Sequence, residues 1–155
     1  AGGNAMIVSE DDPNALPPDA SGYSLDVQVG YVLRRAMQRH LALFSEAIPE
    51  VTTMQFAVLA RLAEAGALSQ NHLGRAVAMD AATVKGVVDR LRRMGPVESR
   101  ADPGDRRRLT VALSEAGRAL YEARKATALA VSTATLAPLS KEEQARFMAL
   151  LVRLT

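Results

Sequence analysis

Basic side chains are concentrated in one stretch of the chain, between Asp80 and Arg108. This stretch holds eight basic and five acidic residues and has a net charge of +3, whereas the whole chain carries only +2. Lysine and arginine donate hydrogen bonds to phosphate oxygens and to base edges. A local positive charge of this kind is typical of the surface that a DNA-binding protein presents to phosphate. Plain solvation is the alternative interpretation of any single arginine here.

The first half of this stretch has the pattern of an amphipathic helix. Val84, Val88 and Leu91 recur at helical spacing, while Asp80 can cap the beginning and Gly95 can end the helix. Such a helix fits the major groove of double-stranded DNA. The candidate DNA contacts on it are Ala82, Thr83, Lys85, Gly86, Arg90 and Arg93.

These candidates have different expected roles. Lys85 is the first candidate for a base edge or phosphate, Thr83 can donate to either, and Ala82 can meet a thymine methyl group. Gly86 lowers helix propensity by about 1 kcal/mol relative to alanine, and a close approach to the DNA backbone would explain it. For Thr83, the alternative is an ordinary residue near a helix N-terminus. Arg90 and Arg93 are phosphate contacts or solvated charges.

The second half of the stretch predicts a β-hairpin. Two strand-like runs flank the turn cluster Asp102-Pro-Gly-Asp105, and three arginines, 106–108, follow it. An arginine on a thin hairpin can reach the minor groove. Asp105 and Arg107 are two residues apart, so we expect the carboxylate to hold the Arg107 guanidinium in position. Arg106 and Arg108 are then left to face phosphate or solvent.

A short helix is predicted just before the basic one. Ser69 can cap it, and Ser69, Gln70 and Asn71 lie at its N-terminus, which is a natural phosphate site. Capping alone also explains Ser69. Two short helices in close succession, the second basic on its outer face, predict a helix-turn-helix motif.

The remaining sequence predicts helices on both sides of this motif. The expected divisions are an expression remnant and mobile acidic arm (1–23), a first dimerisation helix (24–50), a DNA-binding lobe (51–113) and C-terminal dimerisation helices (114–155), all within one domain. Capping boxes at Thr52 and Ser140 and a serine cap at Ser114 mark three of the helix starts. The fold class is therefore mainly α with a small β-hairpin.

Four motifs carry a resemblance to a known family: Gln55-Phe-Ala-Val-Leu59, Ala82-Thr-Val-Lys-Gly-Val-Val-Asp-Arg-Leu91, Asp102-Pro-Gly-Asp-Arg-Arg107 and Leu113-Ser-Glu-Ala-Gly-Arg118. From about residue 25 onward the chain resembles the MarR (multiple antibiotic resistance regulator) family. The resemblance implies a winged helix-turn-helix between intertwined dimerisation helices, with Arg107 entering the minor groove. Pro96 departs from the leucine common in the family and is expected to alter the base of the wing.

Composition argues against several other classes. The chain has no cysteine and no apolar run long enough to span a membrane, and no secretory signal is visible, so we expect a cytoplasmic protein without a disulfide framework. The two histidines, His40 and His72, have no partners at metal-ligand spacing. We therefore expect no enzyme activity, no metal and no cofactor.

The first long helix carries a candidate ligand site. Tyr31, Arg34, Arg35 and Gln38 can share one face, and His40 lies on the same helix. Arginine beside tyrosine suits a small anionic, largely apolar ligand such as an aromatic acid or an acyl-coenzyme A thioester. Dimer ion pairs and surface charge are the alternative.

Together these patterns predict a homodimeric repressor that binds a roughly palindromic operator in double-stranded DNA. A ligand of this kind would release it, which fits control of aromatic-compound catabolism. The alternative is a winged-helix protein-interaction module that does not bind DNA. The net positive charge of the stretch 80–108 disfavours this alternative.

Overall fold

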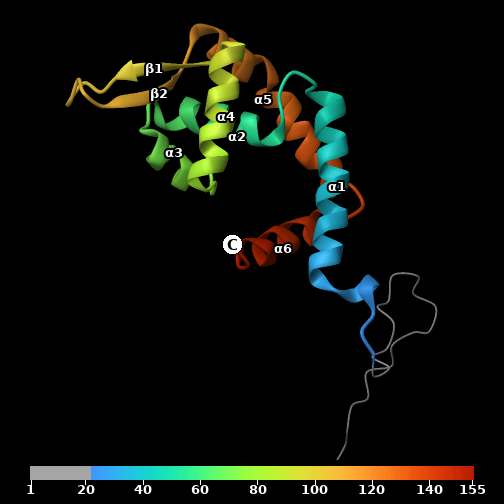
Figure 1. Cartoon of the computed structure of the whole chain (residues 1–155). Coiled ribbons are helices and arrows are strands. Elements are labelled where there is room, and N and C mark those ends of the chain that lie inside the picture. Colours follow the sequence, from blue (N-terminus) through green and yellow to red (C-terminus); the bar gives the residue numbers. More distant parts are fainter. Residues whose placement is uncertain (1–21) are drawn as a thin grey trace, which may run out of the picture. The chain divides into compact units, whose positions relative to one another are not determined.

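A computed structural model describes residues 22–155 of the chain, and the predicted expression remnant and arm lie outside this range except for residues 22 and 23. The elements, shown in Figure 1, are the 3-10 turn Leu25–Val27, α1 Val29–Ala47, α2 Thr53–Ala65, α3 Gln70–Ala76, α4 Ala81–Met94, β1 Val97–Ala101, β2 Leu109–Leu113, α5 Glu115–Leu136 and α6 Lys141–Val152. The described part of the chain divides into two units, residues up to 37 and residues 38–155. The mainly helical class with one hairpin is confirmed.

Side-chain caps set the starts of the helices. The hydroxyls of Thr52 and Ser140 form complete capping boxes at α2 and α6. Ser69, Asp80 and Ser114 each accept a hydrogen bond from the backbone N–H three residues ahead. Each cap satisfies an N–H group that has no partner within its own helix. The predicted helix starts at these five residues are confirmed.

The hydrophobic core lies where α2, α3, α4 and the hairpin meet. Its fully buried side chains include Leu59 of α2, Leu73 of α3, and Val84, Val88 and Leu91 of α4. The three residues of α4 are the apolar stripe that the sequence predicted. Their burial fixes which side of α4 faces away from the protein, because the helical period leaves the polar positions outside.

The turn between α3 and α4 is tight. Ala78 adopts φ +54°, and the Met79 N–H donates to the Gly74 carbonyl at 2.9 Å. A Cβ at Gly74 would lie 3.1 Å from both the Met79 carbonyl oxygen and a methyl of Val84. Glycine therefore permits the close contact between the two helices, and the helix-turn-helix prediction is confirmed.

The hairpin is a regular antiparallel pair, in which Val97 faces Leu113 and Ala101 faces Leu109. Leu68 adds a short third bridge through two hydrogen bonds with Val111. Pro96 directly precedes the first paired residue, Val97, so the ladder needs no backbone donor at the proline.

The base of the hairpin is fixed to the start of α5. The Pro96 carbonyl accepts from the Ser114 N–H at 3.0 Å, and the Ser114 hydroxyl donates to the Gly95 carbonyl at 2.6 Å. A Cβ at Gly117 would lie only 1.8 Å from the Pro96 oxygen. Only glycine fits this approach, so α5 and the hairpin contact each other backbone to backbone.

The terminal helices keep apolar side chains on the surface. On α5 and α6 these exposed residues are Leu129, Phe147, Met148, Leu150 and Val152, and the exposed Leu154 lies just beyond the end of α6. Within residues 38–155, α5 also contacts the chain around the end of α1, where Arg124 pairs with Glu50. This hydrogen bond lowers the pKa of Glu50. Along residues 22–155 no helix is both long and apolar enough to cross a membrane.

Candidate nucleic-acid interface

The outer face of α4 presents most of the predicted contacts to solvent. Ala82, Lys85, Gly86, Arg90 and Arg93 are all exposed. Nothing would lie within 4 Å of a Cβ at Gly86, so no packing within the chain explains this glycine.

Thr83 differs from the other predicted contacts on α4 because it is partly buried. Its backbone N–H donates to the Asp80 carboxylate at 2.7 Å. This hydrogen bond lowers the pKa of Asp80, and the carboxylate stays ionised at the helix start.

Lys85 is not free on this face. Its Nζ lies 2.6 Å from one carboxylate oxygen of Asp89, while Nη1 of Arg92 lies 3.1 Å from the other. The hydrogen bond from Lys85 lowers the pKa of Asp89 most, and the neighbouring positive charges add to it. A DNA contact by Lys85 therefore competes with an ion pair that the sequence interpretation did not include.

The start of α3 presents a second set of polar groups beside α4. The Ser69 hydroxyl accepts from the His72 N–H at 3.3 Å, so its capping role is confirmed. Asn71 and His72 are exposed, whereas Gln70 is half-buried. A shallow hollow of about 560 Å³ runs from these residues to Asp102 and Arg108 of the hairpin.

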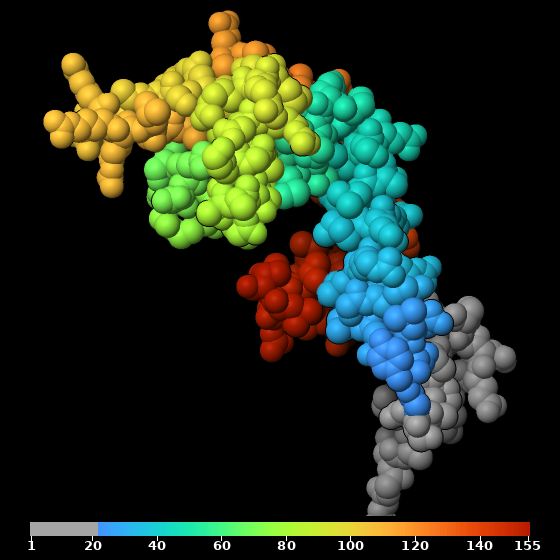
Figure 2. Space-filling model, viewed as in Figure 1, coloured from blue at the N-terminus to red at the C-terminus, as the bar shows by residue number. Residues whose placement is uncertain are grey.

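The tip of the hairpin is an ordered turn with exposed arginines. The Asp102 carboxylate accepts from the Gly104 N–H at 2.8 Å, and the Asp105 carboxylate accepts from the Arg107 N–H at 3.0 Å. Arg106 and Arg107 are exposed, and long side chains project from this tip in Figure 2.

The expected contact between the Asp105 carboxylate and the Arg107 guanidinium is wrong. The carboxylate bonds the backbone N–H of Arg107, because an aspartate in a turn reaches the amide two residues ahead more easily than the end of a long side chain. Asp105 thus shapes the loop, and the guanidinium is left without an ion pair among residues 22–155.

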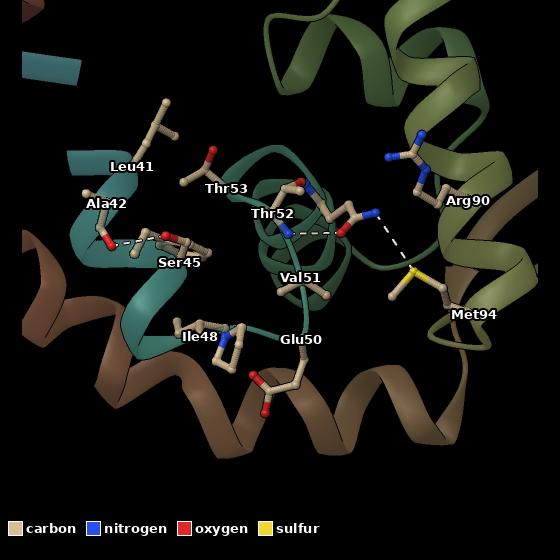
Figure 3. A pocket seen from close by; sticks show the side chains of 13 residues that line it. Leu41, Ala42, Ser45, Ile48, Glu50, Val51, Thr52, Thr53, Arg90 and Met94 are labelled. Atoms are coloured by element: carbon tan, nitrogen blue, oxygen red, sulfur yellow. Dashed lines mark hydrogen bonds between the residues drawn. The ribbon is translucent and has the colours of Figure 1, made fainter. Parts of the chain in front are cut away.

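A cleft of about 650 Å³ lies beside α4. Leu41 and Ser45 of α1, the start of α2, and Arg90 and Met94 of α4 line it, and the Arg90 guanidinium points toward the cleft (Figure 3). At its base, the buried Gln55 accepts from the Thr52 N–H at 2.9 Å. Arg90 therefore borders both the cleft and the outer surface.

The predicted ligand residues on α1 are only partly brought together. The guanidinium carbons of Arg34 and Arg35 lie 5.2 and 5.8 Å from the centre of the Tyr31 ring, which is cation–π distance. Gln38 is exposed two turns further along α1. His40 contacts α5, since its Nδ1 lies 2.9 Å from the Thr135 hydroxyl, and its ring centre lies 6.4 Å from that of Phe44.

Sequence reasoning missed the ion pairs that Asp89 forms with Lys85 and Arg92 on this surface. Lys85, Asp89 and Arg92 follow the i, i+4 and i, i+3 spacings at which helical side chains meet, so the signal was present. No cluster of three or more His, Asp or Glu residues able to hold a metal occurs in the part of the chain that the structure describes.

A short helix, a tight turn, a second helix with exposed cations and an arginine-tipped hairpin define a winged helix-turn-helix regulator. The sequence profile of the MarR family matches residues 51–109. With the relatives described next, this match shows that the chain belongs to the MarR family of transcriptional regulators.

The relatives cover nearly the whole chain. The HTH-type transcriptional repressor NicR of Pseudomonas putida is 38% identical over 141 residues, which span 90% of this chain and 89% of NicR. The structure of a probable transcriptional regulator from Pseudomonas aeruginosa is 51% identical, with a TM-score of 0.82, and covers 85% of this chain and 100% of the other.

A third relative is Bordetella bronchiseptica BpsR, a protein whose DNA binding is regulated by 6-hydroxynicotinic acid. It is 38% identical, has a TM-score of 0.80, and covers 86% of this chain and 96% of the BpsR chain. These similarities agree with the fold and group the chain with transcription regulators, not with enzymes.

Proposed function

We propose that this protein is a repressor that binds a palindromic operator in double-stranded DNA as a homodimer. The observation that carries the proposal is the exposure of Lys85, Arg90 and Arg93 on α4 together with Arg106 and Arg107 on the hairpin. A helix of this kind enters the major groove, and arginines on the hairpin reach the backbone or the minor groove. NicR, a repressor by name, supports this direction of regulation.

The exposed apolar residues of α6, together with Leu154 just beyond its end, support the dimer. Phe147, Leu150 and Leu154 are 38%, 49% and 71% exposed in the single chain. Large apolar side chains grouped on one helix mark a surface that another protein covers. A second copy of this chain is the occupant we propose, because two lobes related by a twofold axis match the two halves of a palindrome.

The proposed inducer is a small aromatic or heteroaromatic carboxylic acid, or its coenzyme A thioester. Support comes from BpsR, which 6-hydroxynicotinic acid regulates, and from two arginine-bearing places in this chain. One is the Tyr31, Arg34 and Arg35 face of α1, and the other is the cleft bordered by Arg90. A ligand releases DNA only if it binds the DNA-free conformation more tightly.

DNA binding is tested by fluorescence anisotropy with labelled duplexes and a salt titration. The wild-type protein is expected to prefer one duplex selected from a random library over a scrambled duplex of the same composition. Its affinity should fall steeply as salt rises, because phosphate contacts release counterions. A folded protein that binds neither duplex at low salt would contradict the proposal and favour the protein-interaction module.

Ligand release is tested by thermal shift and then by operator binding, with 6-hydroxynicotinic acid and benzoic acids as probes. An acid that binds should raise the melting temperature and release the operator. Loss of both effects in the double variant Arg34→Ala, Arg35→Ala assigns the ligand to the face of α1 that carries Tyr31. Filling the cleft with Ser45→Phe should abolish both effects if the cleft is the site. Binding that survives both variants would refute both locations.

A further inference from the structure

Asp89 places a negative charge on the helix face that is proposed to meet DNA. Its side chain is 34% exposed. One carboxylate oxygen lies 2.6 Å from the Lys85 ammonium, and the other lies 3.1 Å from the Arg92 guanidinium. A carboxylate in this position repels phosphate and partly neutralises two of the cations that would attract it. On a surface that only had to bind DNA tightly, this charge would be a disadvantage.

Helix stability does not explain the residue. Aspartate is a weak helix former, and position 89 lies beyond the middle of α4, far from the N-terminus where a carboxylate caps free N–H groups. Lysine four residues before an acid is also the less favourable order for a helical ion pair. Asp80 already caps the helix. The stability of α4 therefore does not explain why a negative charge stands at position 89.

The edge of a G·C base pair offers such a reason. In the major groove, guanine presents the acceptors N7 and O6, and the neighbouring cytosine amino group presents a donor. Lysine is a recognised partner for guanine, and aspartate accepts from cytosine N4. Lys85 and Asp89 already hold a donor and an acceptor side by side on the outer side of α4. Arg92, which already donates to Asp89, can keep this hydrogen bond when the carboxylate moves to the base edge.

We infer that Asp89 is a specificity-determining residue that reads one G·C base pair in each half-site together with Lys85. At that base pair Lys85 moves onto guanine and Asp89 accepts from cytosine, so both charges keep a partner. On unrelated DNA the two cations turn to phosphates, and the carboxylate is left without a donor and facing negative charge. The residue thus weakens non-specific binding more than operator binding. This inference rests on the proposed DNA-binding function.

The test compares Asp89→Asn with the wild type on a selected operator and on a scrambled duplex, at the same salt concentration. The variant should bind the scrambled duplex more tightly and lose specificity by at least about fivefold, the lower end of what one base contact supplies. In operators with single base-pair changes, its discrimination should relax at one G·C position in each half-site. In the Lys85→Ala background, Asp89→Asn should have a much smaller effect at this position.

Glu64→Gln is the matched control, because Glu64 forms an i, i+3 ion pair with Arg61 on α2, outside the predicted interface. It changes the net charge equally and should shift both affinities by the same factor. Asp89→Gln provides a second variant, and melting temperatures confirm that all of them fold.

Two outcomes separate the inference from the proposed function. If wild-type protein prefers its operator and Asp89→Asn keeps that preference at every base pair, the inference is wrong while the proposed function stands. If the wild-type protein shows no sequence preference on any duplex, the proposed function fails and the inference fails with it.

Discussion

Arg107 combines an exposed guanidinium with a backbone that the Asp105 carboxylate holds in place. A fixed loop lowers the entropy lost when the side chain enters a groove. Arg107→Ala should therefore weaken operator binding by about 1–3 kcal/mol if the contact is to a base edge or narrow groove. Operator anisotropy and melting temperature would be measured together, with Arg61→Ala as control. Unchanged affinity in a folded variant would remove Arg107 from the interface.

Asp80 allows a prediction about pH. Hydrogen bonds from Thr83 lower the pKa of its carboxyl in the folded protein. The stabilisation is therefore complete above the ordinary carboxyl pKa and is lost as pH falls through the lowered value. Asp80→Ala should reduce the melting temperature at neutral pH, and the difference from wild type should shrink in strong acid. A pH-independent difference would show that the charge of Asp80 contributes nothing.

At the residue scale, the sequence predicted which side chains face outward better than it predicted their hydrogen-bond and ion-pair partners. The outward direction of Lys85 and Arg93 followed from helical period. Three contacts depend on side-chain rotamers or on tertiary packing: the ion pair between Lys85 and Asp89, the bond of the Asp105 carboxylate to a backbone N–H, and the hydrogen bond between His40 and Thr135. A one-dimensional pattern allows several partners for each of these groups, and only the packed structure selects one.

Two glycines on different helices give opposite predictions for the same substitution. Gly117→Ala forces a Cβ against the Pro96 carbonyl, so it should cost about 1–3 kcal/mol of stability or more. Gly86→Ala meets open space and should stabilise α4 by up to about 1 kcal/mol. Denaturant unfolding measures both. Equal effects of the two substitutions would contradict the close approach at Gly117.

Gly86→Ala also tests the approach of α4 to DNA. If the helix backbone comes close to the duplex at this position, the added methyl group should weaken operator binding although the protein becomes more stable. Operator affinity that is equal to wild type would leave Gly86 without a role in the interface.

At the element scale, the sequence predicted most of the boundaries because caps and breakers are local signals. Thr52, Ser69, Asp80, Ser114 and Ser140 each start the helix that was expected. The accommodation of Pro96 was not predictable, because it depends on the distant Gly117, whose lack of a side chain has meaning only once α5 lies against the hairpin.

For the whole molecule, we predict a dimer that depends on α6. Leu150→Glu, Leu154→Glu should produce monomers and abolish high-affinity operator binding, because charged side chains replace apolar ones on the proposed interface. Light scattering at micromolar concentration measures the assembly. Lys141→Glu changes charge at the exposed start of the same helix and should leave the dimer intact. A monomeric wild type would refute the prediction.

The contact between hairpin and α5 has a consequence for the DNA sequence itself. Only Ser114 separates β2 from α5, and Gly117 presses against Pro96, so the hairpin cannot turn independently of the long helix. In a pair of copies, the angle between the two α5 helices would then set the distance between the two hairpins. The packing of α5 would therefore determine the number of base pairs between the two half-sites, although α5 lies far from any residue that contacts a base.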